Sequence, residues 1–277
     1  MKVLKVLNNN VVIAEHEEFE EVILTGKGIG FGKKTGDSVG EEKAEKFFIL
    51  HGKEEQEQYK QLLNEVSEDF IACMNEAMSF VKEQYKFELN EHIHIGLTDH
   101  LFFAVRRLQQ GMEIKNPFLH ETELAYPKEY AAAEEIIEYM NRCVGVSLPK
   151  GEIGFVTLHL HSAVSNRSLS DVNKHTQLVS NLTEVIEKSL NIELDPKDMN
   201  HQRLFRHLHQ AIQRIQNNTY NEEEPHSLKK VLMEEYPVCY NLSWKLIKIM
   251  QHSLQTTIPD SEAVYLTLHM QRLSRTK

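Results

Sequence analysis

The chain has few cysteines and no long apolar run. Its three cysteines, Cys73, Cys143 and Cys239, are scattered and form no CxxC pair. This pattern predicts buried or idle thiols, and it argues against a disulfide framework or a cysteine-based zinc site. No apolar stretch in the sequence has the length of a membrane-spanning helix. The N-terminal MKVLKVLNNN turns polar before a signal-peptide core can form. The sequence therefore predicts a cytoplasmic protein without a membrane partner.

Basic residues are also fewer than acidic residues. The chain has 31 Lys and Arg against 41 Asp and Glu, a formal net charge of −10. A chain this acidic is not a nucleic-acid binder throughout, so any such activity must come from a local basic patch. With 41% hydrophobic and 26% charged residues, the composition is that of a folded chain. Histidine, by contrast, is plentiful, with 15 residues of which several recur in matching contexts.

Two parts of the sequence repeat each other. The segment SLPKGEIGFVTLH at 147–159 matches TIPDSEAVYLTLH at 257–269. Upstream, Tyr126 matches Tyr236 with the same offset of 110 positions, so no gap separates these blocks. Self-similarity of this kind indicates that the same structural unit occurs twice.

A third repeated block lies earlier in each copy. Residues 97–108 match 204–215 with an offset of 107, so a three-residue length difference falls in the connection that follows. In the first copy this connection, 109–118, is polar and contains glycine and proline, which is typical of a loop. The repeat predicts two homologous domains, at 62–168 and 172–277, each of a size that suits a compact domain.

The repeated blocks carry helical spacing. Apolar residues of the third block fall on one face of a helix, and prolines followed by acids mark helix starts before 152 and 262. Residues 131–140 and 242–250 have the same period. Because these apolar stripes must be buried, each repeat is predicted to be an all-α helical bundle. The stripe of the third block consists of Leu97, Leu101, Ala104, Val105 and Leu108.

The N-terminal residues 1–56 have a different texture. Short runs rich in Val, Ile, Leu and Phe alternate with Asn, Glu and Gly, which are strand and turn signals. A domain of this size buries little surface, and dimerisation is one way to stabilise it. The predicted fold class is therefore α+β multidomain, with a small antiparallel β domain before two homologous helical bundles. The four expected strands lie at 3–7, 10–14, 21–25 and 47–50.

A glycine-rich stretch, TGKGIGFGKK at 25–34, follows the third expected strand. It lacks the GxxxxGK[ST] spacing of a phosphate-binding loop and the helix that should follow, so no nucleotide cofactor is predicted. Glycines allow close backbone approach, lysines neutralise phosphates, and Phe31 can stack on an unpaired base. The asparagines at 8–10 can pair with base edges. RNA binding and a plain glycine-rich turn with solvated lysines both fit these residues.

Together these motifs resemble the BglG/SacY family of sugar-operon antiterminators. Members have an N-terminal co-antiterminator RNA-binding domain and two phosphotransferase-system (PTS) regulation domains. The resemblance covers essentially the whole chain, and LNEHIHIGLTDH at 89–100 and AVYLTLHMQRL at 263–273 are most similar to the glucose-type branch. It is carried by KVLKVLNNNVV at 2–12, TGKGIGFGKKTGD at 25–37, LTDHLFFAVRRLQQGMEIKNPFL at 97–119, GEIGFVTLHLHSA at 151–163 and the blocks around His207 and His269.

The resemblance implies a regulator without catalytic residues, cofactor or metal. As a homodimer, the N-terminal domain would bind a leader mRNA hairpin, the ribonucleic antiterminator, and prevent an overlapping terminator from forming. Where many relatives carry Arg, Lys27 keeps the charge but lacks the planar fork, so this contact can differ. The family's RNA contacts map onto Lys5, Asn8, Asn10, Gly26, Lys27 and Phe31.

The family's phosphorylated histidines map onto His100 and His159 in the first repeat and His207 and His269 in the second. The implied donors are the EIIB/EIIA domain of a sugar-specific PTS permease and the phosphocarrier HPr. A neutral imidazole nitrogen is nucleophilic near pH 7, which fits this role. The alternative is that each histidine is a polar residue packed between helices.

Arginines accompany these histidines. Arg107 follows His100 by seven residues, and Arg214 follows His207 in the same way, which places each pair two helical turns apart, about 10 Å along the axis. These arginines are expected to attract an acidic donor or receive a phosphate. Arg203, one turn before His207, is expected to contact its phosphate directly.

Two other functions fit parts of the sequence. The pairs His92/His94 and His159/His161 could ligate a metal on strands, as in a metal enzyme. However, residues two apart on a helix point in different directions, and the second repeat has Gln271 in place of His161. A DNA-binding regulator with the same sensory domains would need helices at its N-terminus, where this sequence predicts strands.

Overall fold

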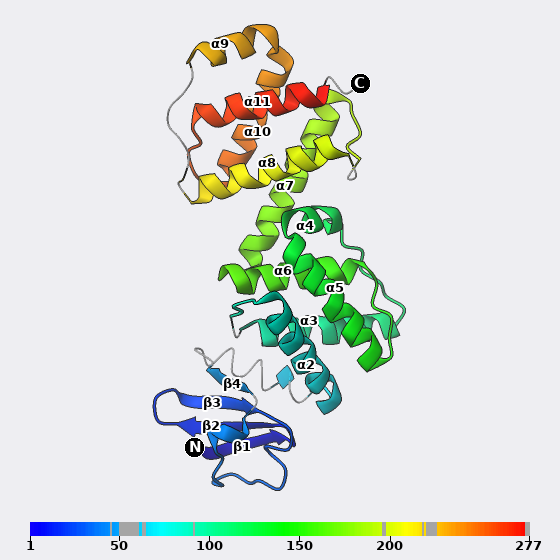
Figure 1. The fold of residues 1–277 in the computed structure, drawn as a ribbon, viewed down its shortest axis with the longest axis vertical. Coiled ribbons are helices and arrows are strands. Elements are labelled where there is room, and N and C mark those ends of the chain that lie inside the picture. Colours follow the sequence, from blue (N-terminus) through cyan, green and yellow to red (C-terminus); the bar gives the residue numbers. More distant parts are fainter. Residues whose placement is uncertain are drawn as a thin grey trace. The chain divides into compact units, whose positions relative to one another are not determined.

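A computed structural model describes residues 1–44, 46–49, 61–62, 65–90, 92–195, 198–217, 219 and 226–274. Within these residues, a four-stranded sheet is followed by ten α-helices (Figure 1). The predicted α+β fold class is therefore confirmed. The chain forms two compact units, which are considered separately below: Met1–Lys115 with Ala131–Asn166, and Asn116–Tyr130 with Arg167–Lys277.

The sheet is antiparallel, with strand order β1-β2-β3-β4. Val12 lies opposite Leu24 and Ala14 opposite Val22, so alternate side chains of β2 and β3 share one face and form a core. Each strand falls close to a short apolar run of the sequence. The strands are β1 (Lys2–Asn8), β2 (Val11–His16), β3 (Glu20–Thr25) and β4 (Lys46–Ile49).

The glycine stretch forms a loop that leads from the end of β3 to the free edge of β1. There, Gly36 N donates to Val3 O (2.7 Å) and Val3 N donates to Asp37 O (2.8 Å). Gly28 and Gly32 adopt φ of +72° and +68°, backbone conformations that favour glycine. The predicted loop is thus confirmed, and a short 3-10 helix, η1 (Glu41–Lys43), comes before β4.

The first unit also contains helices of the first repeat. Helix α2 is capped by Ser67, whose Oγ accepts a hydrogen bond from Phe70 N (3.3 Å). Helices α3 and α6 pack against each other and hold two of the four histidines mapped above. These helices are α2 (Glu68–Tyr85), α3 (His92–Gln109), α5 (Pro127–Val144) and α6 (Gly151–Ser165).

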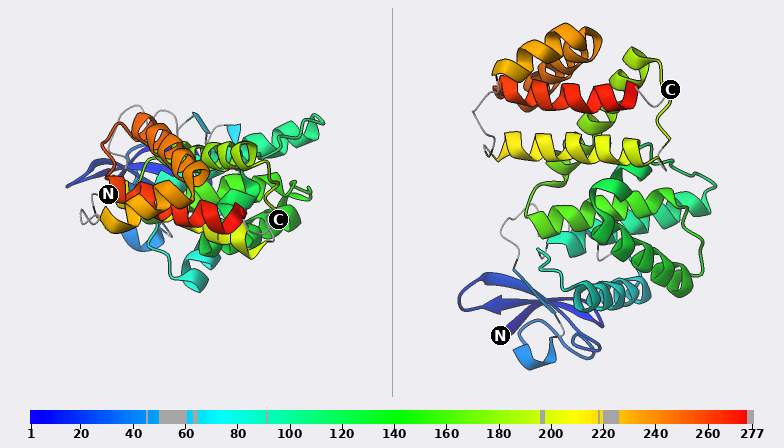
Figure 2. Two further views of the ribbon diagram at one scale, coloured as in Figure 1. Left: turned by 90° about the horizontal axis from the view of Figure 1, so that it is seen from above. Right: turned by 45° about the horizontal axis from the view of Figure 1, so that its top comes forward.

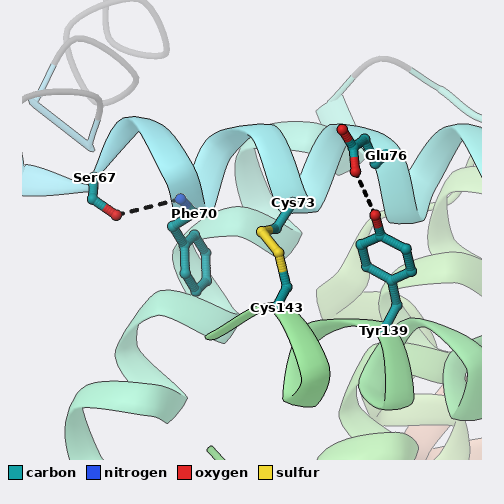
Figure 3. The surroundings of a disulfide bond; sticks show 6 residues. All are labelled: Ser67, Phe70, Cys73, Glu76, Tyr139 and Cys143. Carbon is teal, nitrogen blue, oxygen red and sulfur yellow. Dashed lines mark hydrogen bonds between the residues drawn. A yellow bond between two sulfur atoms is a disulfide. The ribbon is translucent and has the colours of Figure 1, made fainter. Parts of the chain in front are cut away.

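A disulfide joins Cys73 on α2 to Cys143 on α5, with a Cα–Cα distance of 6.3 Å (Figure 3). Beside it, Tyr139 donates a hydrogen bond to Glu76, linking the same two helices. The expectation of idle thiols is therefore wrong for this pair. The pairing spans 70 residues and follows from helix packing, which cysteine spacing does not reveal. Cys239 is a buried free thiol, as expected.

The second unit contains the second repeat. Helix α8 has the same 18-residue length as α3, and α11 the same 15 residues as α6. Figures 1 and 2 show α8 (yellow) and α11 (red) running side by side. The helices of this unit are α4 (Leu119–Ala125), α7 (Leu169–Leu190), α8 (Met199–Gln216), α9 (His226–Glu235), α10 (Pro237–Leu254) and α11 (Asp260–Ser274).

Helix α4 comes from the first repeat but packs on α7 and α8. Its Thr122 is fully buried, and the Tyr126 ring meets the edge of His209 at 5.4 Å. The boundaries of the compact units therefore differ from those of the repeat. The predicted domain boundaries at 62–168 and 172–277 stay predictions. Among the described residues, no helix is long and apolar enough to cross a membrane.

Candidate functional site

The β1–β2 turn and the glycine loop are joined by three hydrogen bonds. Gly26 N donates to Asn10 O and Gly30 N to Asn9 O, both at 2.9 Å. Gly28 N donates to Asn10 Oδ1 at 2.7 Å. The carbonyl oxygen of the Asn10 side chain therefore holds the loop in place, and the turn and the loop form one connected surface. This surface, 9–10 with 26–31, is called the turn–loop surface below.

The side chains predicted to bind RNA are not all in one place. Asn10, Gly26 and Lys27 line the same cavity, and Lys27 is exposed. The Phe31 ring is 75% exposed at the end of the turn–loop surface. Lys5 is exposed on β1, whereas the side chain of Asn8 lies outside the described part of the structure. Of the predicted residues, Asn10, Gly26, Lys27 and Phe31 therefore lie together on the turn–loop surface.

An acid that the sequence reading missed contacts this surface. Glu68, the first residue of α2, accepts hydrogen bonds from Asn9 N (3.0 Å) and from Asn10 Nδ2 (3.4 Å). Asp69 and Glu76 on the same helix line the cavity next to Lys27. Ser67-Glu68 is a helix-start pattern, but no local pattern indicates that Glu68 meets a turn 58 residues away.

The first histidine cluster lies between α3 and α6. The rings of His100 and His159 are 5.2 Å apart, and Phe155 lies 5.5 Å from His100. His100 Nε2 is 2.8 Å from Glu152 Oε2, and Arg107 donates to Glu152 Oε1 at 3.2 Å. Glu152 is 2% exposed. One buried carboxyl group thus links the histidine to the arginine.

Helix geometry explains why these residues meet. His100 and Arg107 are seven residues apart on α3, and Glu152 and His159 are seven apart on α6. Residues at this spacing share one helix face, two turns apart. Packing the two faces together therefore brings four polar groups into one cluster at the edge of the apolar contact.

The second cluster has the same parts in a different arrangement. The rings of His207 and His269 stack with centroids 3.7 Å apart. Arg214 donates to Glu262 in three hydrogen bonds, from Nε at 3.1 Å and from NH2 at 2.9 and 2.8 Å. All four residues line a cavity of about 410 Å³ that also includes Tyr265. The cavity gives an approaching group access to both rings.

The surroundings of His159, His207 and His269 favour neutral imidazoles. Burial, with a smaller effect of His100, lowers the pKa of His159 to about 3. Burial, followed by His207 and Arg272, lowers the pKa of His269 to about 4. The pKa of His207 is lowered by burial and then by nearby arginines. A neutral ring keeps a nucleophilic lone pair at neutral pH. The arginines that act on His207 are Arg214, Arg206, Arg272 and Arg203.

Acid is therefore expected to destabilise the second unit. The pKa of His269 falls from the usual 6.5 to about 4 on folding, so its stabilising contribution is complete above pH 6.5 and is lost as the pH falls below that value. At pH 5 the loss amounts to about 1–2 kcal/mol. Urea unfolding followed by the fluorescence of Trp244, on α10 of the same unit, measures it at pH 7 and pH 5.

A His269→Gln variant is the control for this pH dependence, because glutamine is polar but does not titrate. Its free energy of unfolding is expected to change less between pH 7 and pH 5 than that of the unaltered chain. The same change in both chains would show that the neutral state of His269 does not contribute to folding.

The structure places Arg107 and Arg214 next to buried acids: each one binds a glutamate of its own unit. That they attract an acidic donor or receive a phosphate stays a prediction. Arg203 acts on the pKa of His207, which agrees with its predicted proximity. The two glutamates had been recognised only as helix-start residues. Their recurrence at the same position of both repeats was the available signal.

The structure also bears on the alternatives. His94 lies in α3, whose first residue is His92, and His159 and His161 lie in α6. Side chains two apart on a helix diverge, which does not suit a shared metal. Among the described residues 1–44 and 46–49, the N-terminus forms a sheet, whereas a DNA-binding helix pair would need two helices there.

Two domain families match the chain. The CAT RNA binding domain matches residues 1–57, and the PRD domain matches residues 75–163 and 180–273. Together they account for most of the sequence, and the PRD domain occurs twice, in agreement with the internal repeat.

Similar proteins match over nearly their whole length. The PtsGHI operon antiterminator of Bacillus subtilis (strain 168) is 49% identical over 98% of this chain and 96% of its own. The GlcA/glcB genes antiterminator of Staphylococcus carnosus (strain TM300) is 34% identical over 98% and 95%. A solved structure titled "Crystal structure of GlcT CAT-PRDI" is 50% identical, with a TM-score of 0.54, and covers 60% of this chain and 98% of its own.

Proposed function

The chain belongs to the BglG/SacY family of transcription antiterminators, in its glucose-type branch, and we propose that its N-terminal domain binds a leader-RNA hairpin as a homodimer. Binding prevents an overlapping terminator from forming upstream of a sugar PTS gene. The 49% identity to a protein named PtsGHI operon antiterminator favours a glucose permease transcript as the target. Phosphorylation of histidines in the two PRD domains controls this activity.

The turn–loop surface is the observation that supports RNA binding. Asn10 holds the glycine loop against the β1–β2 turn, and both Phe31, which is 75% exposed, and Lys27 are accessible on this loop. Such a surface offers a stacking ring and a cation for phosphates. Lys5, Asn8 and Gly26 complete the proposed contact set. Residues 1–55 are expected to bind RNA alone, in a salt-dependent way.

The paired histidines support phosphoryl control. Each PRD domain holds two rings on facing helices, His100 with His159 and His207 with His269. A phosphoryl group adds negative charge and three acceptor oxygens, which can break or build a symmetric contact between domains. The EIIB/EIIA domain of the permease is the proposed donor for the first pair, and HPr for the second.

The expected effect of phosphorylation on the first domain is inhibition. When sugar is absent, the permease holds its phosphoryl group and transfers it to the first PRD domain, which disfavours the active dimer. A phosphoryl group on His100 would bring negative charge and added volume to the contact between α3 and α6, where Glu152 lies 2.8 Å from the ring nitrogen Nε2. This change at a packed interface provides the driving force for rearrangement.

A His100→Asp replacement tests this control in the full chain. We expect about 10-fold weaker binding of the leader hairpin, within the usual range of coupling between sites. The titration uses a hairpin RNA with internal loops at fixed salt. His120→Asp is the control, because His120 is exposed in the first turn of α4. Equal RNA affinity of His100→Asp and the unaltered chain would contradict control through the first domain.

A further inference from the structure

The two histidine clusters differ in which group the buried glutamate holds. In the first, Glu152 Oε2 is 2.8 Å from His100 Nε2, and its other oxygen accepts from Arg107. In the second, Arg214 donates three hydrogen bonds to Glu262, and His207 stacks on His269 instead. The same residue types at equivalent positions thus produce two different environments for the first histidine of each pair.

The contact with Glu152 determines which ring nitrogen of His100 carries a proton. A carboxylate that is paired with a guanidinium group can only accept hydrogen bonds. The nitrogen that faces it, Nε2, must therefore donate. In a neutral imidazole, one nitrogen is a donor and the other keeps its lone pair. The lone pair of His100 consequently lies on Nδ1, on the side of the ring away from Glu152.

We propose that Glu152 is a positioning residue that fixes His100 as the Nε2–H tautomer, so that Nδ1 is the nitrogen that accepts the phosphoryl group. This inference rests on the proposed phosphorylation of His100. No such role is assigned to Glu262, because it pairs with Arg214 while His207 stacks on His269. The two PRD domains therefore differ in how their first histidine is held for accepting a phosphoryl group, as well as in their proposed donors.

Phosphoryl transfer to His100 needs no proton transfer. The Nδ1 lone pair of His100 attacks the phosphorus of the donor's phosphoryl group, and the bond between that phosphorus and the donor atom breaks and returns its electron pair to the donor. The His100 ring then carries a positive charge, and its Nε2–H still donates to Glu152. A buried carboxylate stabilises that imidazolium in the way an aspartate does in a catalytic triad.

The tautomer can be measured before any phosphorylation. In the full chain labelled with ¹⁵N histidine, the nitrogen shifts of His100 distinguish Nε2–H from Nδ1–H, and His100→Gln assigns the signals. We expect Nε2–H in the unaltered chain and in Glu262→Gln. In Glu152→Gln the amide can donate to Nε2, so the Nδ1–H form should increase. An unaltered chain with His100 in the Nδ1–H form would overturn the inference.

Phosphoryl transfer provides the second test. The full chain is treated with phosphoramidate, a small phosphoryl donor, and with phosphorylated HPr or permease domain, and the phosphohistidine isomer at position 100 is identified. We expect the Nδ1 isomer, formed about 100-fold more slowly in Glu152→Gln, since the acid-to-amide exchange in a triad lowers turnover about 10⁴-fold by reversing the tautomer. Glu262→Gln should react at position 100 at the unaltered rate.

These outcomes separate the inference from the proposed function. Phosphate on Nε2, or an unchanged rate in Glu152→Gln, would overturn the positioning role even if phosphorylation regulates the protein. If His100 accepts phosphate from phosphoramidate but from no PTS protein, the proposed donor is wrong, while the isomer still decides the role of Glu152. A folding defect in Glu152→Gln does not affect the tautomer measured in the unaltered chain.

Discussion

Replacing Phe31 by alanine is expected to weaken binding of the leader hairpin by the full chain about 10- to 100-fold. Stacking of one base on an aromatic ring contributes roughly 1–3 kcal/mol. The Phe31 ring is 75% exposed and belongs to a glycine loop rather than to the core of the sheet, so its removal should cost binding energy and little stability. The glycine loop is held by Asn10, and this bond is unaffected by the substitution.

Phe19→Ala is the matched control for that result. Phe19 is an exposed aromatic of the same domain, but it lies in the β2–β3 turn, at the opposite end of the strands from the turn–loop surface, and stacks on His16. Both variants are titrated with the hairpin at several salt concentrations. Full affinity of Phe31→Ala, or an equal loss in both variants, would show that RNA does not stack on this ring.

The fold could be predicted from the sequence wherever the signal was local. The strands β1–β4 follow from short runs rich in Val, Ile, Leu and Phe between turn residues, and the central helices from apolar residues repeated about every 3.6 positions. The repeat added long-range information. Since α3 and α8 begin at His92 and Met199 and have equal lengths, the offset of 107 read from the sequence is the offset of the helices themselves.

The candidate site could be predicted only as a list of residue types. The pairing of His100 with His159 follows from the repeat and from helix packing, but the hydrogen bonds around the histidines do not. Which glutamate oxygen a histidine contacts, and that Arg214 takes both oxygens of Glu262, depends on side-chain rotamers at a packed interface. The contact of Glu68 with the β1–β2 turn is likewise long-range and has no signature in either segment.

The pairing of the cysteines and the packing of α4 could not be predicted from the sequence, for a related reason. Cys73 and Cys143 lie on different helices, and α4 packs on helices of the other repeat. Sequence spacing describes neighbours along one element, whereas these contacts depend on how elements pack in three dimensions. A domain boundary inferred from repeated sequence therefore need not coincide with the boundary of a compact unit.

The largest expected loss of stability comes from replacing Arg214 by alanine. Glu262 is 3% exposed, and Arg214 donates three hydrogen bonds to its carboxylate. Removing one partner of a buried ion pair leaves a charge without compensation and costs several kcal/mol. Because the Arg214 side chain is itself 38% exposed, water reduces this cost, and we expect about 3 kcal/mol. Urea unfolding followed by Trp244 fluorescence measures the second unit.

Two further variants separate the buried charge from the loss of packing. Lys188→Ala removes an exposed partner of Glu184 on α7 and should cost less than about 1 kcal/mol. Combining Arg214→Met with Glu262→Leu removes both charges and should recover most of the stability, since apolar replacement of a buried pair is often neutral. If the double variant is as unstable as Arg214→Ala, the arginine stabilises the unit through its packing, and Glu262 is not the cause. Recovery in the double variant would instead mean that the pair is retained for the histidine cluster beside it rather than for stability.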